Sequence, residues 1–411
     1  MKILVVGSGG REHAIAWRLA KEGHRVIGAP GNPGIAQAGR IVASTDYLAV
    51  AEAEKVELTV VGPEVPLAAG VVDQFRARGL RIVGPTRENA RLESSKSYSK
   101  LFMQRVGIPT ARFVQTENQA TALESLKDFR YPVVVKADGL AAGKGVVIAQ
   151  HRAEAEAAIA SLGPLLVIEE FLEGEEVSFI VLCDGRDVLA LEATEDHKRI
   201  GDGDAGPNTG GMGAYCDGRI LTHKQTQRVL DTVIAPAVAA TGFTGFLYAG
   251  LMMTANGPKV LEFNVRLGDP ETQPLMHRMD GDFADALLRS ATGQLRGASL
   301  KWKDEPSVCV VMASAGYPGT PRLGDLITGI DANDVVFQAG TRTTARGLET
   351  SGGRVLGVTS SGATLNDAID RTYAIINEIH FDGMQYRRDI AQKGLKRWPT
   401  SRTSPGSPVV A

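Results

Sequence analysis

The sequence predicts an α/β protein built from several successive units, the first of which contains a parallel sheet. Over about the first 90 residues, short β-branched runs alternate with helical stretches. At residues 132–148, a glycine-rich loop separates two further β-branched runs, and another alternation of strands and a helix begins near residue 305. The 411 residues suffice for roughly two to four domains, each with its own core.

Composition excludes several classes of partner. The chain is 43% hydrophobic and 22% charged with a net charge of −2, which favours neither nucleic acid nor an anionic membrane surface. The three cysteines lie far apart without metal-ligand spacing, so we expect reduced thiols. No apolar run approaches the ~20 residues that span a bilayer, and the stretch MKILVVGSGG is too short for a signal-peptide core. We expect a cytoplasmic protein with no membrane partner.

The N-terminal unit has the pattern of a parallel sheet with intervening helices. The expected helices cover 12–22 and 67–78, and the expected strands cover 3–6, 25–27, 58–61 and 81–83. The first turn, GSGGRE, begins like a dinucleotide fingerprint, but Glu12 occupies the third glycine position and would obstruct close helix–strand packing. The second strand also ends without an acid for a ribose, which disfavours NAD. The glycines and the helix N-terminus could still hold a smaller anion.

The stretch PVVVKADGLAAGKGVVI reads as two strands joined by a glycine-rich loop at 138–145. Glycine lets backbone N–H groups approach an anion, and Lys136 and Lys144 add positive charge, which suits a phosphate. It is not a P-loop, because three residues separate Gly139 from Gly143 and a strand follows. An ordinary hairpin loop is the alternative.

Two polar segments follow. The run 169–178 has carboxylates at positions 169, 170, 173, 175 and 176, which indicates either a solvated turn or a nucleoside clamp. The segment 195–214 contains seven glycines or prolines, so we expect no regular element there. A loop that mixes such residues with Asp, His, Lys and Arg is typical of a functional site.

An Asn256-Gly257 turn joins apolar runs at 246–253 and 259–264, which predicts a hairpin. Glu262 and Asn264 are two residues apart and so share one strand face, where their oxygens suit Mg²⁺. The polar face of an edge strand is the alternative. A later α/β unit has expected strands at 308–313, 334–338 and 354–359 and a helix at 365–379.

In this order, the segments VVVKADGLAAGKGV, IEEFLEGEEVSF, DHKRIGDGDAGPNTGGMGA and LEFNVRLGDPETQ resemble the ATP-grasp ligases. The last two are similar to those of the glycinamide ribonucleotide synthetase (phosphoribosylamine–glycine ligase) family, and the resemblance runs from GSGGREHA to RRDI. It implies an ATP-grasp fold with an N-terminal parallel α/β (pre-ATP-grasp) domain at 1–92 and an ATP-grasp domain at 93–304. The latter includes a lid subdomain at about 111–183. A C-terminal α/β domain at 305–395 and a disordered tail at 396–411 complete the expected organisation.

The resemblance also implies the reaction. ATP would phosphorylate the glycine carboxylate, and 5-phosphoribosylamine would attack the glycyl phosphate to give glycinamide ribonucleotide, ADP and phosphate in de novo purine biosynthesis. The implied cofactors are ATP and Mg²⁺, with Mn²⁺ as a substitute, and the small-molecule partners are glycine and 5-phosphoribosylamine. A monomer or weak dimer is expected.

Site residues are implied by the same resemblance. The catalytic set is Arg266, Lys136 and Asp269, and Glu262 and Asn264 would bind the metal. The residues implied to bind ATP are Lys96, Lys136, Gly143, Lys144, Gly145, Glu169, Glu170, Phe171, Leu172 and Glu176. The residues implied to bind the other substrates are Gly9, Gly10, Arg11, Lys198, Asp204, Asn208, Thr209, Gly210, Gly211, Met212, Gly213, Gly268 and Pro270.

The sequence departs from the family pattern at two positions, and two other functions share part of it. The strand at 246–250 lacks the acidic metal ligand that many ATP-grasp enzymes carry, and Leu267 replaces a Phe. Another ATP-grasp carboxylate–amine ligase would share the lid and the metal strand. A regulatory nucleotide-binding protein on an inactive scaffold would not need Lys136, Glu262, Asn264 and Arg266 together.

Overall fold

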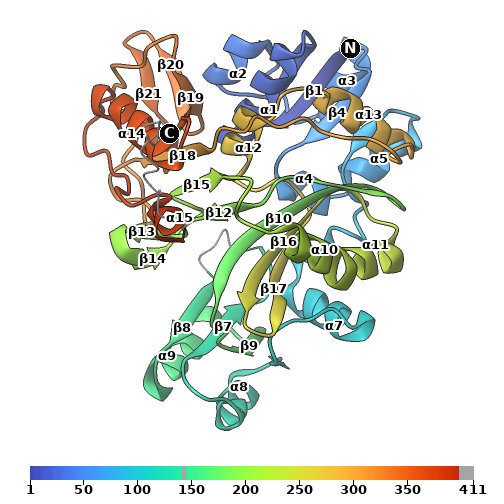
Figure 1. Cartoon of the computed structure of the whole chain (residues 1–411), viewed down its shortest axis with the longest axis vertical. Helices are drawn as coiled ribbons and strands as arrows, with labels where there is room; N and C mark the ends of the chain where they lie inside the picture. Colours follow the sequence, from blue (N-terminus) through green and yellow to red (C-terminus); the bar gives the residue numbers. More distant parts are fainter. Residues whose placement is uncertain (141–144, 398–411) are drawn as a thin grey trace, which may run out of the picture.

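A computed structural model describes residues 1–140 and 145–397. The N-terminal unit contains a five-stranded parallel sheet in the order β3-β2-β1-β4-β5, as the sequence predicts (Figure 1). The strands are β1 (Lys2–Gly7), β2 (Arg25–Pro30), β3 (Arg40–Ile41), β4 (Leu58–Val61) and β5 (Ile82–Val83). The first three helices are α1 (Gly10–Lys21), α2 (Pro33–Ala38) and α3 (Tyr47–Glu54).

Two expectations for this unit are corrected. The helix expected at 67–78 is two helices, α4 (Glu64–Ala68) and α5 (Val71–Ala77), because Gly70 between them has a left-handed φ of 88°. Glu12 does not obstruct packing of α1. Its buried carboxylate accepts a hydrogen bond from the backbone N–H of Gly9, and its side chain lies against Gly7 and Gly62, which have no Cβ to meet it.

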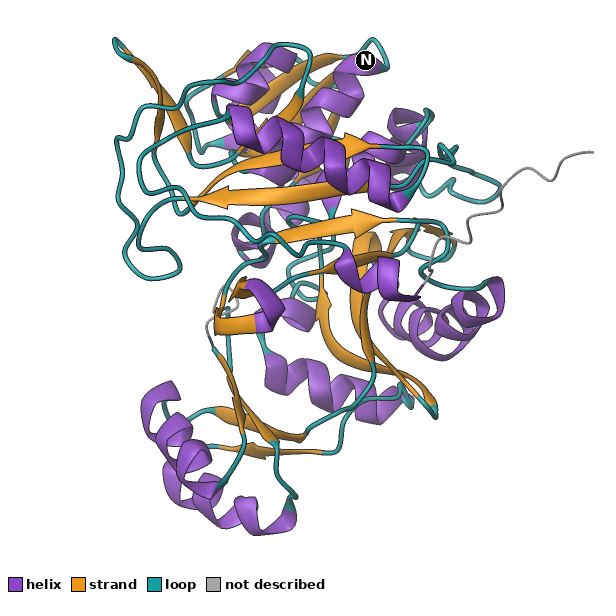
Figure 2. Cartoon of the chain, turned by 60° about the vertical axis from the view of Figure 1, so that its left-hand side comes forward, coloured by secondary structure: helices purple, strands orange, loops and turns teal. Residues whose placement is uncertain are grey.

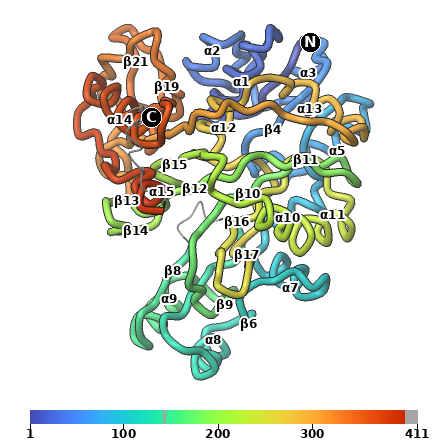
Figure 3. The backbone as a smooth tube through the Cα atoms, in the orientation of Figure 1, coloured from blue at the N-terminus to red at the C-terminus, as the bar shows by residue number. Residues whose placement is uncertain are grey.

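A linking segment leads to the lid subdomain. Helices α6 (Arg91–Ser94) and α7 (Lys96–Val106) precede it, with Ser95 capping α7 by accepting from the N–H of Tyr98. The lid sheet is antiparallel in the order β6-β9-β7-β8 and is packed against two helices, at the end of the molecule opposite the N-terminal sheet (Figures 2 and 3). Its elements are β6 (Phe113–Thr116), α8 (Gln119–Ser125), η1 (Leu126–Asp128), β7 (Val133–Ala137), β8 (Val146–Ala149), α9 (Arg152–Leu162) and β9 (Leu166–Glu170).

A nine-stranded sheet forms the centre of the molecule. Its main path is β17-β16-β10-β12-β15-β18-β22-β19, and β11 pairs with β10. The Asn256-Gly257 turn joins β16 and β17, so the predicted hairpin is confirmed. These strands are β10 (Glu175–Asp184), β11 (Val188–Ala190), β12 (Thr194–Asp196), β15 (Gly213–Cys216), β16 (Thr244–Thr254), β17 (Gly257–Asn264), β18 (Ser307–Ala313), β19 (Val335–Gln338) and β22 (Arg354–Ser361).

The C-terminal strands therefore continue the central sheet, because β18 pairs with β15. One hydrophobic cluster extends from Leu4 and Phe75 of the N-terminal unit through Phe179 to Val310. The remaining elements are α10 (His223–Val229), the π-helical turn η3 (Leu230–Ile234), α11 (Ala235–Thr241), α12 (Thr272–Arg278), α13 (Phe283–Thr292), β20 (Thr341–Thr344), β21 (Gly347–Thr350), α14 (Leu365–Glu378) and α15 (Gln392–Arg397).

The segment 195–214 is more regular than expected. Besides β12 and β15 at its ends, it forms a hairpin of β13 (Arg199–Gly201) and β14 (Ala205–Asn208) around the turn η2 (Asp202–Asp204). Its glycines serve the tight turns, since Gly203 and Gly206 both have positive φ. Lys396 and Arg397, expected in the tail, belong to α15, where Arg397 forms ion pairs with acidic residues of β10 and β12. Gly143, Lys144 and the rest of the tail lie outside the described residues. Within the described ranges, no helix is long and apolar enough to cross a membrane.

Candidate active site

Lys136 lies at the C-terminal end of β7, between the lid sheet and the central sheet. It is 7% exposed, and its Nζ is 3.0 Å from Oε2 of Glu169 and donates to the carbonyl of Leu261 at 3.2 Å. Lys100 lies 3.1 Å from the same Glu169 oxygen and donates to Thr110. Burial lowers the pKa of Lys100 to about 8 against the opposing effect of Glu169. The Glu169 side chain is therefore buried between two ammonium groups.

A third lysine, Lys96, joins this cluster from the first turn of α7. Lys96 donates to the carbonyl of Gly139 at 2.8 Å, at the base of the predicted lid loop. The carboxylate of Asp138 accepts from the N–H of Ser97 at 3.2 Å and so fastens the same base to α7. Burial lowers the pKa of Lys96, and Lys136 lowers it further, while the carboxylate of Glu262 opposes both effects. Three lysines thus lie together where the lid sheet meets α7 and β17.

Glu262 and Asn264 lie on β17 beside these lysines. Burial would raise the pKa of Glu262, but the cationic groups of Lys198, Lys136, Lys96 and Arg266 lower it overall. No other residue of the described chain forms a hydrogen bond or ion pair with the Glu262 carboxylate. The Oδ1 of Asn264 accepts from Arg266 Nη2 at 3.1 Å.

This oxygen pair fits Mg²⁺. Magnesium is commonly bound by one or two carboxylates together with substrate phosphates and waters. Among the described residues, no group of three or more His, Cys, Asp or Glu is placed to hold a metal.

Arg266 lies between the N-terminal unit and β17. Its Nη2 is 2.7 Å from Glu93, and its Nε is 3.4 Å from Glu64. Burial alone would lower the pKa of Arg266, but the two carboxylates raise it, so the guanidinium stays charged. Sequence reasoning did not assign Glu64 and Glu93 to the site. The turn VGPE, which follows β4, is a signal for Glu64 alone, and no sequence pattern marks Glu93 as a site residue.

Asp269 is held by groups from distant parts of the chain. Its carboxylate is 3.0 Å from Arg354 Nη2 and accepts from Gln273 Nε2 at 2.7 Å. Burial would raise the pKa of Asp269, but Arg354 and Arg11 lower it. Arg11 itself is 6% exposed; it donates to the carbonyl of Leu267 at 3.0 Å and pairs with Glu12 at 2.6 Å. Its guanidinium therefore joins the N-terminal turn to the segment that carries Asp269.

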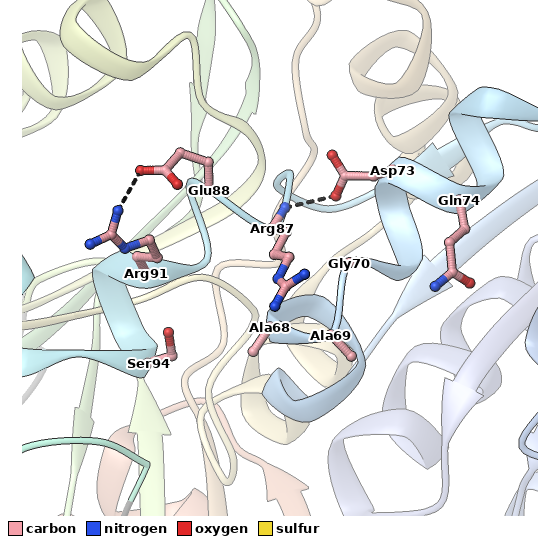
Figure 4. A pocket seen from close by; sticks show the side chains of 9 residues that line it. All are labelled: Ala68, Ala69, Gly70, Asp73, Gln74, Arg87, Glu88, Arg91 and Ser94. Atoms are coloured by element: carbon pink, nitrogen blue, oxygen red, sulfur yellow. Dashed lines mark hydrogen bonds and ion pairs between the residues drawn. The ribbon is translucent and has the colours of Figure 1, made fainter.

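A cavity of about 410 Å³ lies where the N-terminal turn, the Asp269 segment and the C-terminal region meet. Gly9 and Asp269 are the sequence-predicted residues that line it. The other lining residues are Ser8, Gly31, Asn32, Ala339, Gly340, Thr341, Ser351 and Arg354. Ser8 belongs to the glycine-rich first turn, and Gly31 and Asn32 follow the second strand at the sheet edge where such sheets bind ligands, whereas no sequence pattern marked the five residues from 339 to 354. A larger cavity of about 690 Å³ lies between α5 and α6 and contains no predicted site residue (Figure 4).

The segment 197–213 contacts β10, the lid strand β8 and the C-terminal region at different points. Lys198 forms an ion pair with Glu176 on β10, the residue implied to bind ribose. Asn208 donates to the carbonyl of Val146 in the lid at 3.5 Å, and Thr209 donates to the carbonyl of Lys198. The hairpin turn faces away: Asp204 pairs with Arg387 and Lys393, at 2.8 and 2.7 Å.

The remaining predicted site residues lie outside the contacts described above. Gly145 and Met212 are buried, as is Leu172, whereas Phe171 is exposed and Glu170 pairs with Lys259 at 2.9 Å. Gly10, Gly213, Gly268 and Pro270 occupy tight positions. A Cβ at Gly10, for example, would lie 2.8 Å from Gln273 Nε2.

A buried network behind Asp269 was also missed. The Tyr248 hydroxyl donates to Glu271 Oε1 at 2.7 Å, and Ser178 donates to the same oxygen at 3.1 Å. Burial and the nearby Glu271 raise the pKa of Asp196 at the end of β12. No local pattern marks these residues, because they come from four separate strands and loops.

The small antiparallel sheet and the large central sheet meet at Lys136, whose Nζ contacts Glu169 of one sheet and Leu261 of the other, beside the carboxylate–amide pair on β17, and this arrangement is typical of an ATP-grasp protein. Comparison with family models gives matches to three domains of phosphoribosylglycinamide synthetase: the N domain at residues 1–93, the ATP-grasp (A) domain at 94–272 and the C domain at 307–393. The chain belongs to the phosphoribosylglycinamide synthetase family.

Individual relatives agree with this assignment. The phosphoribosylamine–glycine ligase of Ralstonia nicotianae is 51% identical over 422 residues, covering 97% of this chain and all of the relative. The ligase of the same name from Neisseria meningitidis serogroup A is 47% identical over 97% of this chain and all of the relative. A crystal structure of phosphoribosylamine–glycine ligase from Thermotoga maritima superposes with a TM-score of 0.85 at 35% identity, covering 95% of this chain and all of that one.

Proposed function

We propose that this chain ligates glycine to 5-phosphoribosylamine with ATP, giving glycinamide ribonucleotide, ADP and phosphate in de novo purine biosynthesis. One observation carries the proposal: two lysines and an arginine lie around the β17 segment that carries Glu262 and Asn264. Lys136 donates to the carbonyl of Leu261, Lys96 donates to the carbonyl of Gly139 at the base of the lid loop, and Arg266 donates to Asn264. Such an arrangement suits the activation of a carboxylate by phosphoryl transfer. Family membership and the names of relatives aligned over their full length support the choice of substrates.

Activation of glycine is the first requirement, because a carboxylate does not react with an amine. Phosphoryl transfer requires mainly positioning and charge neutralisation. Lys136 and Lys96 supply fixed positive charge to the phosphates, and Glu262 and Asn264 would hold Mg²⁺, for which Mn²⁺ is a proposed substitute. A metal ion held there would supply positive charge to the phosphates.

The nucleotide is proposed to lie between the lid and the central sheet. Backbone groups of Glu170 to Leu172 would contact adenine, and Glu176 the ribose. Glu169 supports this site by holding Lys136 in place rather than by facing solvent. The glycine-rich loop containing Gly143, Lys144 and Gly145 would cover the phosphates.

The second half-reaction needs glycyl phosphate and the amine next to each other. Arg266 is proposed to bind the glycine carboxylate before transfer and the acyl phosphate after it, with Asp269 nearby. The cavity beside Gly9 and Asp269 would receive phosphoribosylamine. The amine nitrogen attacks the acyl carbon of glycyl phosphate. The C–N bond forms, the bond between the acyl carbon and the phosphate oxygen breaks, and inorganic phosphate leaves, while the amine releases a proton to solvent. Closure of the lid subdomain over the bound substrates is proposed to exclude water, which would otherwise hydrolyse the acyl phosphate.

ADP release in the presence of Mg²⁺ tests the function, with glycine and freshly made 5-phosphoribosylamine each omitted in turn. Full turnover should require both. ATP turnover that ignored both would refute the proposal, and a requirement for a different amine would favour another ATP-grasp carboxylate–amine ligase. We also propose a monomer or weak dimer that acts in the cytoplasm, which sedimentation and cell fractionation would check.

A further inference from the structure

Arg354 is the first residue of β22, more than 80 residues beyond the predicted site segments. Its Nη1 donates to the carbonyls of Gly210 at 2.5 Å, Gly211 at 3.3 Å and Asp269 at 2.7 Å. Its Nη2 donates to the Asp269 carboxylate at 3.0 Å. One guanidinium thus contacts two segments that are separated by almost 60 residues in the chain.

These bonds are made to backbone as well as to a carboxylate. Three carbonyl groups could otherwise rotate away from one another, since Gly210 and Gly211 have no side chains to fix them. Gly211 has a positive φ of 113°, and a side chain there would meet Pro270. The hydroxyl of Tyr317 accepts from the N–H of Gly210 at 3.0 Å and holds the same turn from the C-terminal region.

We propose that Arg354 is a positioning residue for the amine half-reaction: it holds Asp269, which lines the phosphoribosylamine cavity, against the backbone of Gly210 and Gly211. This inference rests on the proposed function. Arg354 lines the cavity together with Asp269 and Gly9, whereas Lys96 and Lys136 lie in the lid cleft and have no contact with it. Substitution of Arg354 should therefore lower kcat/KM for phosphoribosylamine much more than it changes KM for ATP.

The chemistry of the side chain explains why arginine stands here. A guanidinium presents five N–H donors in a rigid plane, so it can serve several acceptors at once. A lysine would keep the charge next to Asp269, but its ammonium could not span the same three carbonyls from one position. A glutamine would lose the charge as well.

The experiment compares Arg354→Lys and Arg354→Gln with the unmodified full-length chain, measuring kcat and KM for each substrate and the thermal midpoint of unfolding. Arg278→Lys is the matched control, because Arg278 is also buried and bonded to a carboxylate and a carbonyl, but it lies at the C-terminal end of α12 and does not line the cavity. We expect kcat/KM for phosphoribosylamine to fall about tenfold or more in Arg354→Gln, on the scale of small misplacements of reacting groups. Arg354→Lys should lose less, and KM for ATP should change less than about twofold in both.

The outcomes separate the possible explanations. Unchanged kcat/KM for phosphoribosylamine in both Arg354 variants would overturn the inference. So would a parallel loss for all three substrates that the control reproduces at an equal fall in melting temperature, since that would indicate destabilisation only. If the unmodified chain itself failed to use phosphoribosylamine, the proposed function would fail, independently of Arg354.

Discussion

Replacing Lys136 by Met tests whether its charge acts on phosphate or only supports Glu169. An ammonium about 4 Å from a unit charge contributes about 4 kcal/mol at an effective dielectric constant of ~20. Only the part that grows in the transition state affects kcat, so we expect a loss of about 100- to 1000-fold, as for other electrostatic stabilisers. The rate of ADP release at saturating glycine and phosphoribosylamine measures kcat in Lys136→Met and in the unmodified chain.

Lys100→Met is the matched control, because Lys100 contacts the same Glu169 oxygen at 3.1 Å, against 3.0 Å for Lys136. Each variant leaves Glu169 with one ammonium, so both should lose a similar stability of about 1–3 kcal/mol. We expect kcat to fall much further in Lys136→Met than in Lys100→Met. Equal losses in the two variants would show that Lys136 acts only through Glu169, and an unchanged kcat would remove it from the site.

Three further predictions follow from buried groups. Glu262→Gln should raise the Mg²⁺ concentration needed for half-maximal activity by about tenfold or more; an unaltered metal titration would mean that this strand face is structural. Burial lowers the pKa of His13 from 6.5 to about 4, and its Nδ1 accepts from the N–H of Gln338 at 2.8 Å. The unfolded chain then binds the extra proton first, so His13 contributes stability above pH 6.5 that is lost as the pH falls towards 4, up to about 3 kcal/mol. Thermal midpoints should therefore fall less on acidification in His13→Gln, and an identical pH profile would contradict this. Tyr248→Phe should lower the unfolding free energy by about 1–2 kcal/mol, because Glu271 loses a hydrogen bond of 2.7 Å; unfolding in urea at neutral pH checks it, and no change would argue against the network.

Local patterns were sufficient for much of the fold. Alternating β-branched runs located the parallel sheet, and the Asn256-Gly257 turn located the hairpin that carries the candidate metal ligands. These features depend on near neighbours in the chain, so spacing and turn chemistry reveal them. The break at Gly70 was missed because a single glycine within a helical pattern does not by itself end a helix.

The site residues that sequence patterns did not identify are held by contacts between segments far apart in the chain. Glu93 and Glu64 reach Arg266 from about 170 and 200 residues away, and Arg354 reaches Asp269 across 85 residues. An isolated acid or arginine in a sequence carries no sign of such a partner. For the same reason, the continuity of the C-terminal strands with the central sheet became visible only from the pairing of β15 with β18.

Transfer of oxygen from glycine to phosphate tests the central claim most directly. Glycine labelled with ¹⁸O in its carboxylate is incubated with ATP, Mg²⁺ and phosphoribosylamine, and the inorganic phosphate is analysed by mass spectrometry. If glycine is activated as an acyl phosphate, a single labelled oxygen should appear in each phosphate released, in step with the formation of glycinamide ribonucleotide. Unlabelled phosphate released at the same rate as product would contradict the account.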